Sequence, residues 1–263
     1  MRHRRQLLFG LYFDPLSMDE VIEQCRNALV TRSRVLLGVL NAAKIVNLRG
    51  DEALRNSLME CDLLLADGQS VVWASRLLGR PLPERVAGID IFERLLGLAH
   101  RENRSIYLLG AKPEVLAALQ LRLAQAYPGL RIAGSHHGYF KAAESAEVAE
   151  DIRQSGADML FLGMTSPKKE IFLGAHGASL DVPILHGVGG SFDILAGLTQ
   201  RAPDHWQRSG FEWAYRVMQE PRRLWWRYAR TNTIFLALTL AELLRPARAF
   251  KRSRASAVMQ PAE

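Results

Sequence analysis

Polar residues and glycines follow several apolar runs of the sequence, at the places where chemistry is expected if those runs are strands. Asn41 follows one run, and Asp67 with Gly68 follows the next. The segments "GMTSPKKE" (163–170) and "GVGGSFD" (187–193) follow two later runs. A carboxylate at a strand end can act as a general base, and glycine N–H groups can hold a phosphate. From position alone, Asn41 and Asp67 could equally be helix N-caps, and the glycines could form tight turns.

Several common catalytic and cofactor-binding patterns are missing from the sequence. The run "GVGGSF" has Phe192 where a dinucleotide-binding turn needs its third glycine, and it follows a late apolar run instead of the first. We find no Walker, HExxH or GxSxG pattern, no Cys/His cluster and no D-x-D pair. The histidines are scattered, with His136-His137 the only adjacent pair, and are interpreted as structural. We therefore expect no metal and no cofactor, so that phosphate chemistry would use arginines and backbone N–H groups.

The elements that must position these residues follow from the alternation of short apolar runs with helix-length stretches. The clearest helix candidate is 112–127, with Pro113 early and Pro128-Gly129 after it. Continuous apolar strands that alternate with helices favour a largely parallel sheet covered on both faces. The predicted fold class is α/β, with a Rossmann-like sheet covered by helices and a helical, basic C-terminal appendage. The strand candidates are 34–40, 62–66, 105–111, 130–135, 157–164 and 182–189.

The positive charge of the chain is concentrated near its end. The 263 residues are 48% hydrophobic and carry a formal charge of +7, and residues 201–254 hold 12 Lys and Arg against 4 Asp and Glu. A basic segment on a neutral body predicts a polyanionic partner, such as nucleic acid, an anionic membrane surface or a phosphorylated substrate.

Cysteine usage and the N-terminal run predict an intracellular protein. Cys25 and Cys61 lie far apart with no metal-ligand spacing, and we expect both to be reduced core residues. The start "MRHRRQLLFGLYF" is basic and then apolar, but its apolar run is too short for a signal peptide. We therefore expect a cytoplasmic protein.

Longer motifs resemble a known family. The runs "ADGQSVVWASRLLGRPLPERVAGIDIFERLL" (66–96), "GVGGSFDILAGLTQRAP" (187–203) and "GFEWAYRVMQEPRRLWWRYA" (210–229) are similar to the WecG/TagA/CpsF glycosyltransferases, glycosyltransferase family 26. With "LNAAKIVNLR" and "GMTSPKKEIFL", the resemblance covers roughly residues 8 to 230 in the same order.

The resemblance implies an inverting, metal-independent transfer of a sugar from a UDP-sugar to a lipid-diphosphate-linked acceptor at the inner face of the cytoplasmic membrane. It assigns Asp67 as the general base, and inversion does need a base that deprotonates the acceptor hydroxyl during in-line attack. Asp90 is expected near the acceptor or pocket, and an Asp193–Arg201 ion pair could shape that pocket. The residues expected to bind the donor or its diphosphate are Asn41, Gly68, Lys169, Glu170, Gly189, Gly190, Asp193, Arg201, Arg216, Arg222, Arg223 and Arg227.

Two residues depart from the family pattern. Val39 stands where members often have Thr, so a hydroxyl contact to the donor is missing. Lys169 stands where many have Gln, and it could bring a cation to the diphosphate. The donor is left open between UDP-N-acetylmannosamine and UDP-glucose, and the "TSPKKE" form favours exopolysaccharide synthesis.

The C-terminal region divides into an appendage and a tail. We expect residues 1–200 to form the glycosyltransferase core, and 201–245 to close the active site and contact the membrane. The apolar stretch 233–244 is too short to span a bilayer, and it predicts an interfacial helix beside the aromatic and basic run. Residues 246–263 are expected to be a disordered basic tail.

Two other interpretations remain at this point. A nucleic-acid-binding module could use the same aromatic and cationic segment to stack bases and hold phosphates, although we expect no nucleic-acid partner. A catalytically weak relative that acts as a scaffold is compatible with the departures at Val39 and Lys169. A homo-oligomer is also possible.

Overall fold

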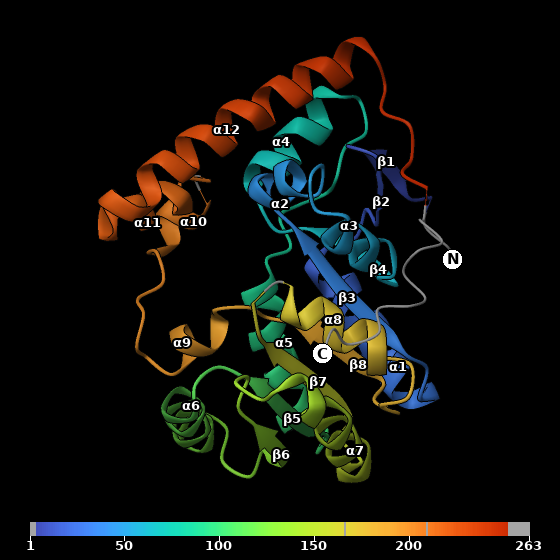
Figure 1. Cartoon of the computed structure of the whole chain (residues 1–263), viewed down its shortest axis with the longest axis vertical. Helices are drawn as coiled ribbons and strands as arrows, with labels where there is room; N and C mark the ends of the chain where they lie inside the picture. Colours follow the sequence, from blue (N-terminus) through green and yellow to red (C-terminus); the bar gives the residue numbers. More distant parts are fainter. Residues whose placement is uncertain (1–3, 166, 209, 252–263) are drawn as a thin grey trace.

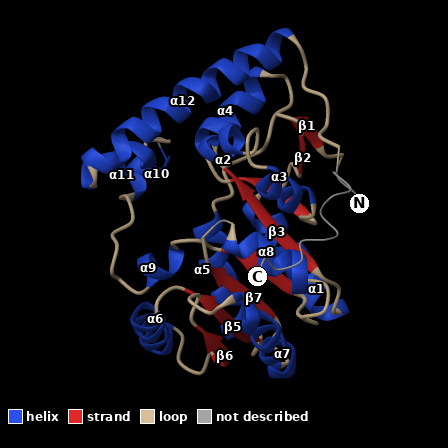
Figure 2. Cartoon of the chain, viewed as in Figure 1, coloured by secondary structure: helices blue, strands red, loops and turns tan. Residues whose placement is uncertain are grey.

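A single parallel sheet forms the centre of the molecule in the computed structural model, which describes residues 4–165, 167–208 and 210–251. Its six strands are arranged in the order β4-β3-β8-β7-β5-β6, and every neighbouring pair is parallel (Figure 1; Figure 2). The predicted α/β fold is thus confirmed. The strands are β3 (Val35–Leu40), β4 (Leu63–Ala66), β5 (Ser105–Gly110), β6 (Arg131–His136), β7 (Met159–Gly163) and β8 (Ile184–Gly187).

Both faces of the sheet are covered, because alternate residues of each apolar strand point to opposite sides. Leu37 and Val39 of β3 belong to the buried group that includes residues of α1, α5 and α6, whereas Leu36 belongs to the group on the other side with residues of α7 and α8. A further group of buried residues joins α2, α3 and α4 to the end of β3. The helices are α1 (Met18–Thr31), α2 (Ala42–Asn47), α3 (Glu52–Met59), α4 (Gln69–Leu77), α5 (Gly88–Arg101), α6 (Pro113–Ala126), α7 (Ser145–Ser155), α8 (Lys168–His176) and α9 (Ser191–Leu195), with a short 3-10 turn, η1 (Ala142–Glu144).

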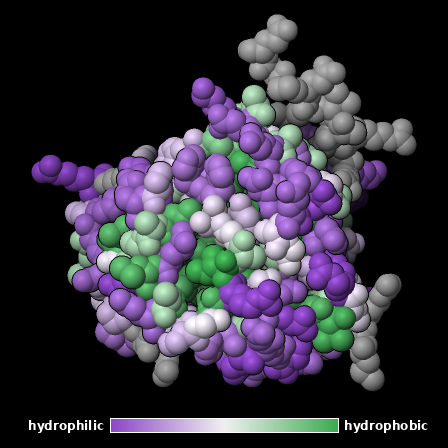
Figure 3. All heavy atoms as spheres, turned by 90° about the horizontal axis from the view of Figure 1, so that it is seen from below, coloured by the Kyte–Doolittle hydropathy of each residue, from purple (hydrophilic) through white to green (hydrophobic). Residues whose placement is uncertain are grey.

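Strand β6 forms one edge of the sheet, and its residues are exposed or only partly buried. Together with α6 and α7 it occupies the lower end of the molecule (Figure 1). Seen from that end, hydrophobic residues gather in a hollow that hydrophilic residues surround (Figure 3).

The N-terminal apolar run forms a hairpin that the sequence did not predict. Strands β1 (Gln6–Leu8) and β2 (Leu11–Phe13) are antiparallel, and Phe9 and Gly10 form the turn with φ of 53° and 88°. Two positive φ angles in a two-residue loop are typical of a turn that matches the twist of the strands. The hairpin is joined to β4 through Asp14, whose carboxylate accepts from Leu64 N at 2.8 Å. Leu8, Phe9, Leu11 and Phe13 of the hairpin are core residues, whereas Tyr12 is exposed.

The C-terminal helices lie across one end of the sheet. They are α10 (Asp204–Arg208), α11 (Glu212–Gln219) and the long α12 (Pro221–Leu244), which packs across α2 (Figure 1). Phe235 of α12 is buried in the same group as the hairpin. Glu242 is also buried, where it accepts from Phe9 N at 2.9 Å and pairs with Arg80 at 3.0 Å.

The stretch 233–244 therefore has two different faces, of which one belongs to the core. Leu236, Leu240, Leu243 and Leu244 lie on the exposed side. Within the described residues, no helix is both long and apolar enough to cross a membrane.

The residues that follow α12 contact the N-terminal hairpin. Residues 246–251, which the sequence assigned to a disordered tail, return to the hairpin, where Phe250 N donates to Gly10 O at 2.9 Å. The rest of the predicted tail, 252–263, lies outside the described residues.

Candidate active site

Asp67 lies directly after β4, at the carboxyl edge of the sheet. Its Oδ1 accepts from Gly88 N at 3.1 Å, and its Oδ2 accepts from the side-chain amide of Asn41 at 3.4 Å. The N-cap of α4 is Gly68, not Asp67, so the helix-cap interpretation is wrong for Asp67. The side chain is partly exposed, and it is held in place while still open to a ligand.

Asn41 is a helix N-cap, as its position suggested, and it also contacts Asp67. It is the N-cap of α2, and its side-chain oxygen accepts from Lys44 N at 3.1 Å. The amide nitrogen of the same side chain is thereby directed at Asp67. Gly68 lies against Asn41, because a Cβ on Gly68 would be 3.4 Å from Asn41 Cβ. The junctions after β3 and β4 therefore form one site.

Four charged side chains lie together at this edge. Lys169 Nζ is 3.1 Å from Glu170 Oε1, and Glu170 is buried. Lys44 Nζ donates to Val39 O at 2.8 Å. Burial lowers the pKa of Lys44, as does the nearby charge of Lys169, while Asp67 and Glu170 act in the opposite direction. The sequence analysis included Lys169 and Glu170 among the expected donor-binding residues, but it did not single out Lys44. The signal for Lys44 was its position one helical turn after Asn41, which places it at the same strand end.

His186 is a second residue of the site that the sequence did not identify. It lies in β8, fully buried, and its Nε2 is 2.8 Å from Gly88 O. Burial lowers its pKa to about 4, so the ring is neutral near pH 7. His186 therefore contacts the same residue that donates to Asp67.

The glycines after β8 leave open space beside the site. Gly189 has φ of 54°, and a Cβ on Gly189 or Gly190 would meet no atom within 4 Å. By contrast, a Cβ on Gly187 would lie 2.8 Å from Lys169 Cδ, so the glycine makes room for that lysine. The backbone of 189–190 is accessible to a ligand, as a phosphate-binding turn requires.

Asp90 and Arg201 belong to an ion-pair network, but Asp193 is not part of it. Arg201 pairs with Asp90 and, at 3.6 Å, with Glu93. The expected Asp193–Arg201 pair is not formed in the described structure, because Arg201 is directed toward the start of α5. The backbone carbonyl of Asp193 instead accepts from Leu198 N at 2.9 Å.

The C-terminal appendage contacts the core next to Asp67. Arg85 bridges Asp90 at 3.2 Å and Glu212 of α11 at 2.9 Å. A Cβ on Gly210 would lie within 3.0 Å of Gln69 and Trp73 of α4, the helix that follows the Asp67-Gly68 pair. The N-terminus of α11 is thus placed beside the candidate base.

The four arginines predicted for the diphosphate lie on α11 and α12. Arg222 and Arg227 are exposed, and the Arg227 guanidinium lies 5.2 Å from the Tyr228 ring centroid. The side chains of Arg216 and Arg223 lie outside the described part of the structure.

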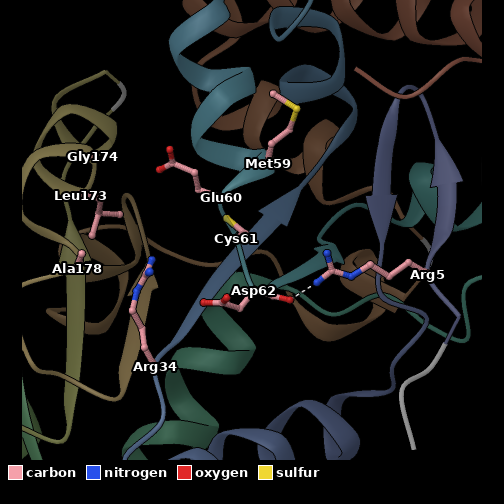
Figure 4. Close-up of a pocket in the computed structure, with 9 residues that line it drawn as sticks. All are labelled: Arg5, Arg34, Met59, Glu60, Cys61, Asp62, Leu173, Gly174 and Ala178. Atoms are coloured by element: carbon pink, nitrogen blue, oxygen red, sulfur yellow. Dashed lines mark hydrogen bonds between the residues drawn. The ribbon is translucent and has the colours of Figure 1, made fainter. Parts of the chain in front are cut away.

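One cleft of about 460 Å³ opens at the opposite edge of the sheet, where β3 and β4 begin (Figure 4). It is lined by Arg34, Cys61 and Asp62, among others. The Asp62 carboxylate already accepts from Leu36 N at 2.8 Å. Because parallel α/β sheets bind ligands at the carboxyl ends of their strands, the candidate active site is the group of residues around Asp67 and not this cleft. In the part of the chain that the structure describes, no three His, Cys, Asp or Glu side chains gather as metal ligands would.

Comparison with known proteins identifies the family of the chain. Residues 6–249 match the model of the "Glycosyl transferase WecG/TagA/CpsF family". Similar curated proteins include the N-acetylglucosaminyldiphosphoundecaprenol N-acetyl-beta-D-mannosaminyltransferases of Staphylococcus aureus strains MW2 and NCTC 8325 / PS 47. Each is 32% identical over 219 residues, which cover 82% of this chain and 85% of the relative. The chain belongs to the WecG/TagA/CpsF family of glycosyl transferases.

Proposed function

We propose that this glycosyltransferase moves N-acetylmannosamine from its UDP-sugar to N-acetylglucosamine on a lipid diphosphate, with inversion and without a metal ion. The observation that carries the proposal is the Asp67 carboxylate, held by Gly88 N and Asn41 at the carboxyl edge of the sheet. The sugar and the acceptor follow the names of the similar staphylococcal enzymes. UDP-glucose remains the alternative candidate for the donor. The predicted biological role remains the synthesis of an exopolysaccharide.

The proposed reaction uses Asp67 as its base. The carboxylate removes the proton from the acceptor hydroxyl while this oxygen attacks the anomeric carbon of the donor. The bond from that carbon to the diphosphate oxygen breaks in the same step, and UDP leaves with the electron pair. Because attack and departure are in line, the configuration at the anomeric carbon inverts.

The leaving diphosphate needs positive charge and N–H donors. The candidates are Arg216, Arg222, Arg223 and Arg227 from the appendage, and the accessible backbone of Gly189 and Gly190. Two contacts support an active-site role for the appendage, because Gly210 packs on α4 and Glu212 pairs with Arg85, both close to Asp67.

Release of UDP tests this proposal directly. The protein is given UDP-N-acetylmannosamine, UDP-N-acetylglucosamine or UDP-glucose together with a detergent-soluble lipid diphosphate that carries N-acetylglucosamine. We expect acceptor-dependent UDP release with the first donor only, and a β-linked product by NMR. Acceptor-dependent release with UDP-glucose alone would replace the proposed donor, and no release with any donor would favour the scaffold interpretation.

The role of Asp67 is tested by Asp67→Asn, which keeps the shape of the side chain but removes its basicity. We expect turnover to fall by about 10² to 10⁴ with little change in KM for the UDP-sugar, because general base catalysis acts in the transition state. A variant that keeps activity within about threefold of the parent would show that Asp67 is not the base.

Metal independence is tested with a chelator. We expect the same turnover in excess EDTA, because arginines and backbone N–H groups stabilise the leaving group. Loss of turnover that magnesium or manganese restores would contradict this part of the proposal.

A further inference from the structure

His186 makes a hydrogen bond that determines which of its ring nitrogens carries the proton. Its Nε2 lies 2.8 Å from Gly88 O. A carbonyl oxygen can only accept, so Nε2 is the protonated nitrogen of the neutral ring. The other nitrogen, Nδ1, is buried and has no partner among the described residues. An unpaired buried nitrogen is unfavourable, and an apolar side chain in this strand would avoid it.

Gly88 connects His186 to Asp67. It is the first residue of α5, where backbone N–H groups have no partner within the helix. Its N–H donates to Asp67 Oδ1 at 3.1 Å, and its C=O accepts from His186. The two contacts lie on either side of the same Cα atom, so a shift of Gly88 would move the donor that orients the carboxylate.

Beyond the backbone of α5 itself, two side chains of the sheet lie closest to Gly88. Ala87, the N-cap of α5, provides no side-chain hydrogen bond. A Cβ on Gly88 would meet Val39 Cγ2 at 3.1 Å and His186 Cε1 at 3.8 Å. Both neighbours are side chains of the sheet, and of these two only His186 bonds to the Gly88 backbone.

We propose that His186 is a positioning residue of the transferase reaction: its Nε2–H holds Gly88 at the start of α5 and thereby orients the Asp67 carboxylate. The inference rests on the proposed role of Asp67 as base. A base must be held close to its productive geometry, and displacement by about 1 Å can cost about 10²-fold in rate. His186 acts through Gly88 and does not touch the substrate.

Two substitutions of His186 distinguish a positioning role of its N–H group from a role in packing alone. His186→Leu fills the strand position without a donor, whereas the amide nitrogen of His186→Gln can take the place of Nε2–H. We expect His186→Leu to lower kcat by about 10- to 100-fold, with KM for the UDP-sugar within about twofold and no loss of thermal stability. His186→Gln should recover kcat to within about threefold of the parent.

The Asp67→Asn background distinguishes failure of this inference from failure of the proposed function. If His186 acts through Asp67, adding His186→Leu to Asp67→Asn should lower kcat no further, because the two residues act as a unit. An active Asp67→Asn enzyme would overturn the proposed function itself. An inactive Asp67→Asn enzyme beside a fully active His186→Leu enzyme would overturn only the role of His186.

A measurement on the unmodified protein covers the case in which the leucine variant does not fold. Nitrogen-15 NMR of the imidazole should show the Nε2-protonated tautomer and no titration between pH 5.5 and pH 8. The Nδ1-protonated tautomer would overturn the inference, as would a loss of activity in His186→Leu that appears only in KM or that His186→Gln does not repair.

Discussion

Two lysines and two carboxylates lie together around Asp67, so their charges offset one another. Lys44 and Lys169 face Asp67 and Glu170, and the charge of Lys169 is already paired with Glu170. The Lys169 ammonium group is therefore already paired in the absence of a ligand. Its contact with the diphosphate remains a prediction. Its contribution to folding can be tested separately, because Glu170 is buried and an uncompensated buried charge is strongly unfavourable.

We predict that Lys169→Met lowers the free energy of unfolding by about 1.5–3 kcal/mol, a range that applies to hydrogen bonds of charged groups. The double variant Lys169→Met/Glu170→Gln should recover part of this loss, since the neutral amide no longer needs a cation. Urea denaturation of the parent, both single variants and the double variant gives the coupling energy. Strictly additive effects would show that the pair is not coupled.

The buried ring of His186 predicts a pH dependence of stability. Burial lowers its pKa to about 4, against about 6.5 in an unfolded chain. Between these values the unfolded chain binds a proton that the folded chain does not, so the free energy of unfolding falls as the pH drops. The loss is on the order of 3 kcal/mol between pH 6.5 and pH 4.

This dependence should be absent from His186→Gln, which does not titrate. Urea denaturation at pH 7, 5.5 and 4.5 should therefore show the parent losing stability more steeply than the variant. Parallel pH profiles for the two proteins would contradict the assigned pKa.

At the scale of elements, the sheet and its strand ends were predictable because each strand is a continuous apolar run. All six predicted strands are present within a few residues, and β4, β3, β8 and β7 are neighbours, so their carboxyl ends meet. The hairpin was missed because its strands are only three residues long, and its Phe9-Gly10 turn lacks the common Asn-Gly signal.

Contacts between distant parts of the chain were not predictable from local pattern. The His186–Gly88 bond joins residues 98 apart, and Arg201 pairs with Asp90 across 111 residues. The sequence analysis suggested Asp193 as the partner of Arg201, but Arg201 pairs with Asp90 and Glu93 instead. The family resemblance assigned Asp67 as the base, which stays a prediction, whereas its contact with Gly88 depends on how α5 is placed over the sheet.

The link between α11 and the core gives a prediction at the same scale. Glu212→Lys would place two cations together at Arg85, and we expect it to loosen the appendage beside Asp67. Turnover on a soluble acceptor should fall by about tenfold or more, as expected when positioning is lost. Proteolysis between α9 and α10 should become faster.

Glu147→Lys makes the same change of charge on an exposed site of α7, and it serves as the matched control. Its turnover and cleavage rate should equal those of the parent. Equal effects of the two substitutions would show that net charge, and not the contact with Arg85, is responsible.

For the whole molecule, α12 presents an apolar and aromatic surface whose opposite side is anchored in the core. Trp225 and Trp226 are 64% and 71% exposed, and Leu240 and Leu244 are 49% and 83% exposed. Phe235 and Glu242 on the inner side pack against the hairpin region. Truncation before these residues would therefore damage the fold, and point substitutions on the outer face are the better test of membrane contact.

We predict that Leu240→Ser/Leu244→Ser weakens binding to vesicles that contain an anionic phospholipid by about tenfold or more, because each leucine contributes about 1.5–3 kcal/mol when fully buried. Melting temperature and turnover on a detergent-soluble acceptor should stay unchanged. Leu121→Ser, which removes a leucine that is 64% exposed on α6, should leave vesicle binding as in the parent.

Added salt should weaken binding of all these proteins, since residues 201–254 carry the excess of basic charge. If vesicles are not bound while a single-stranded oligonucleotide binds with the same salt dependence, the basic surface serves nucleic acid instead, and the membrane assignment of α12 is wrong.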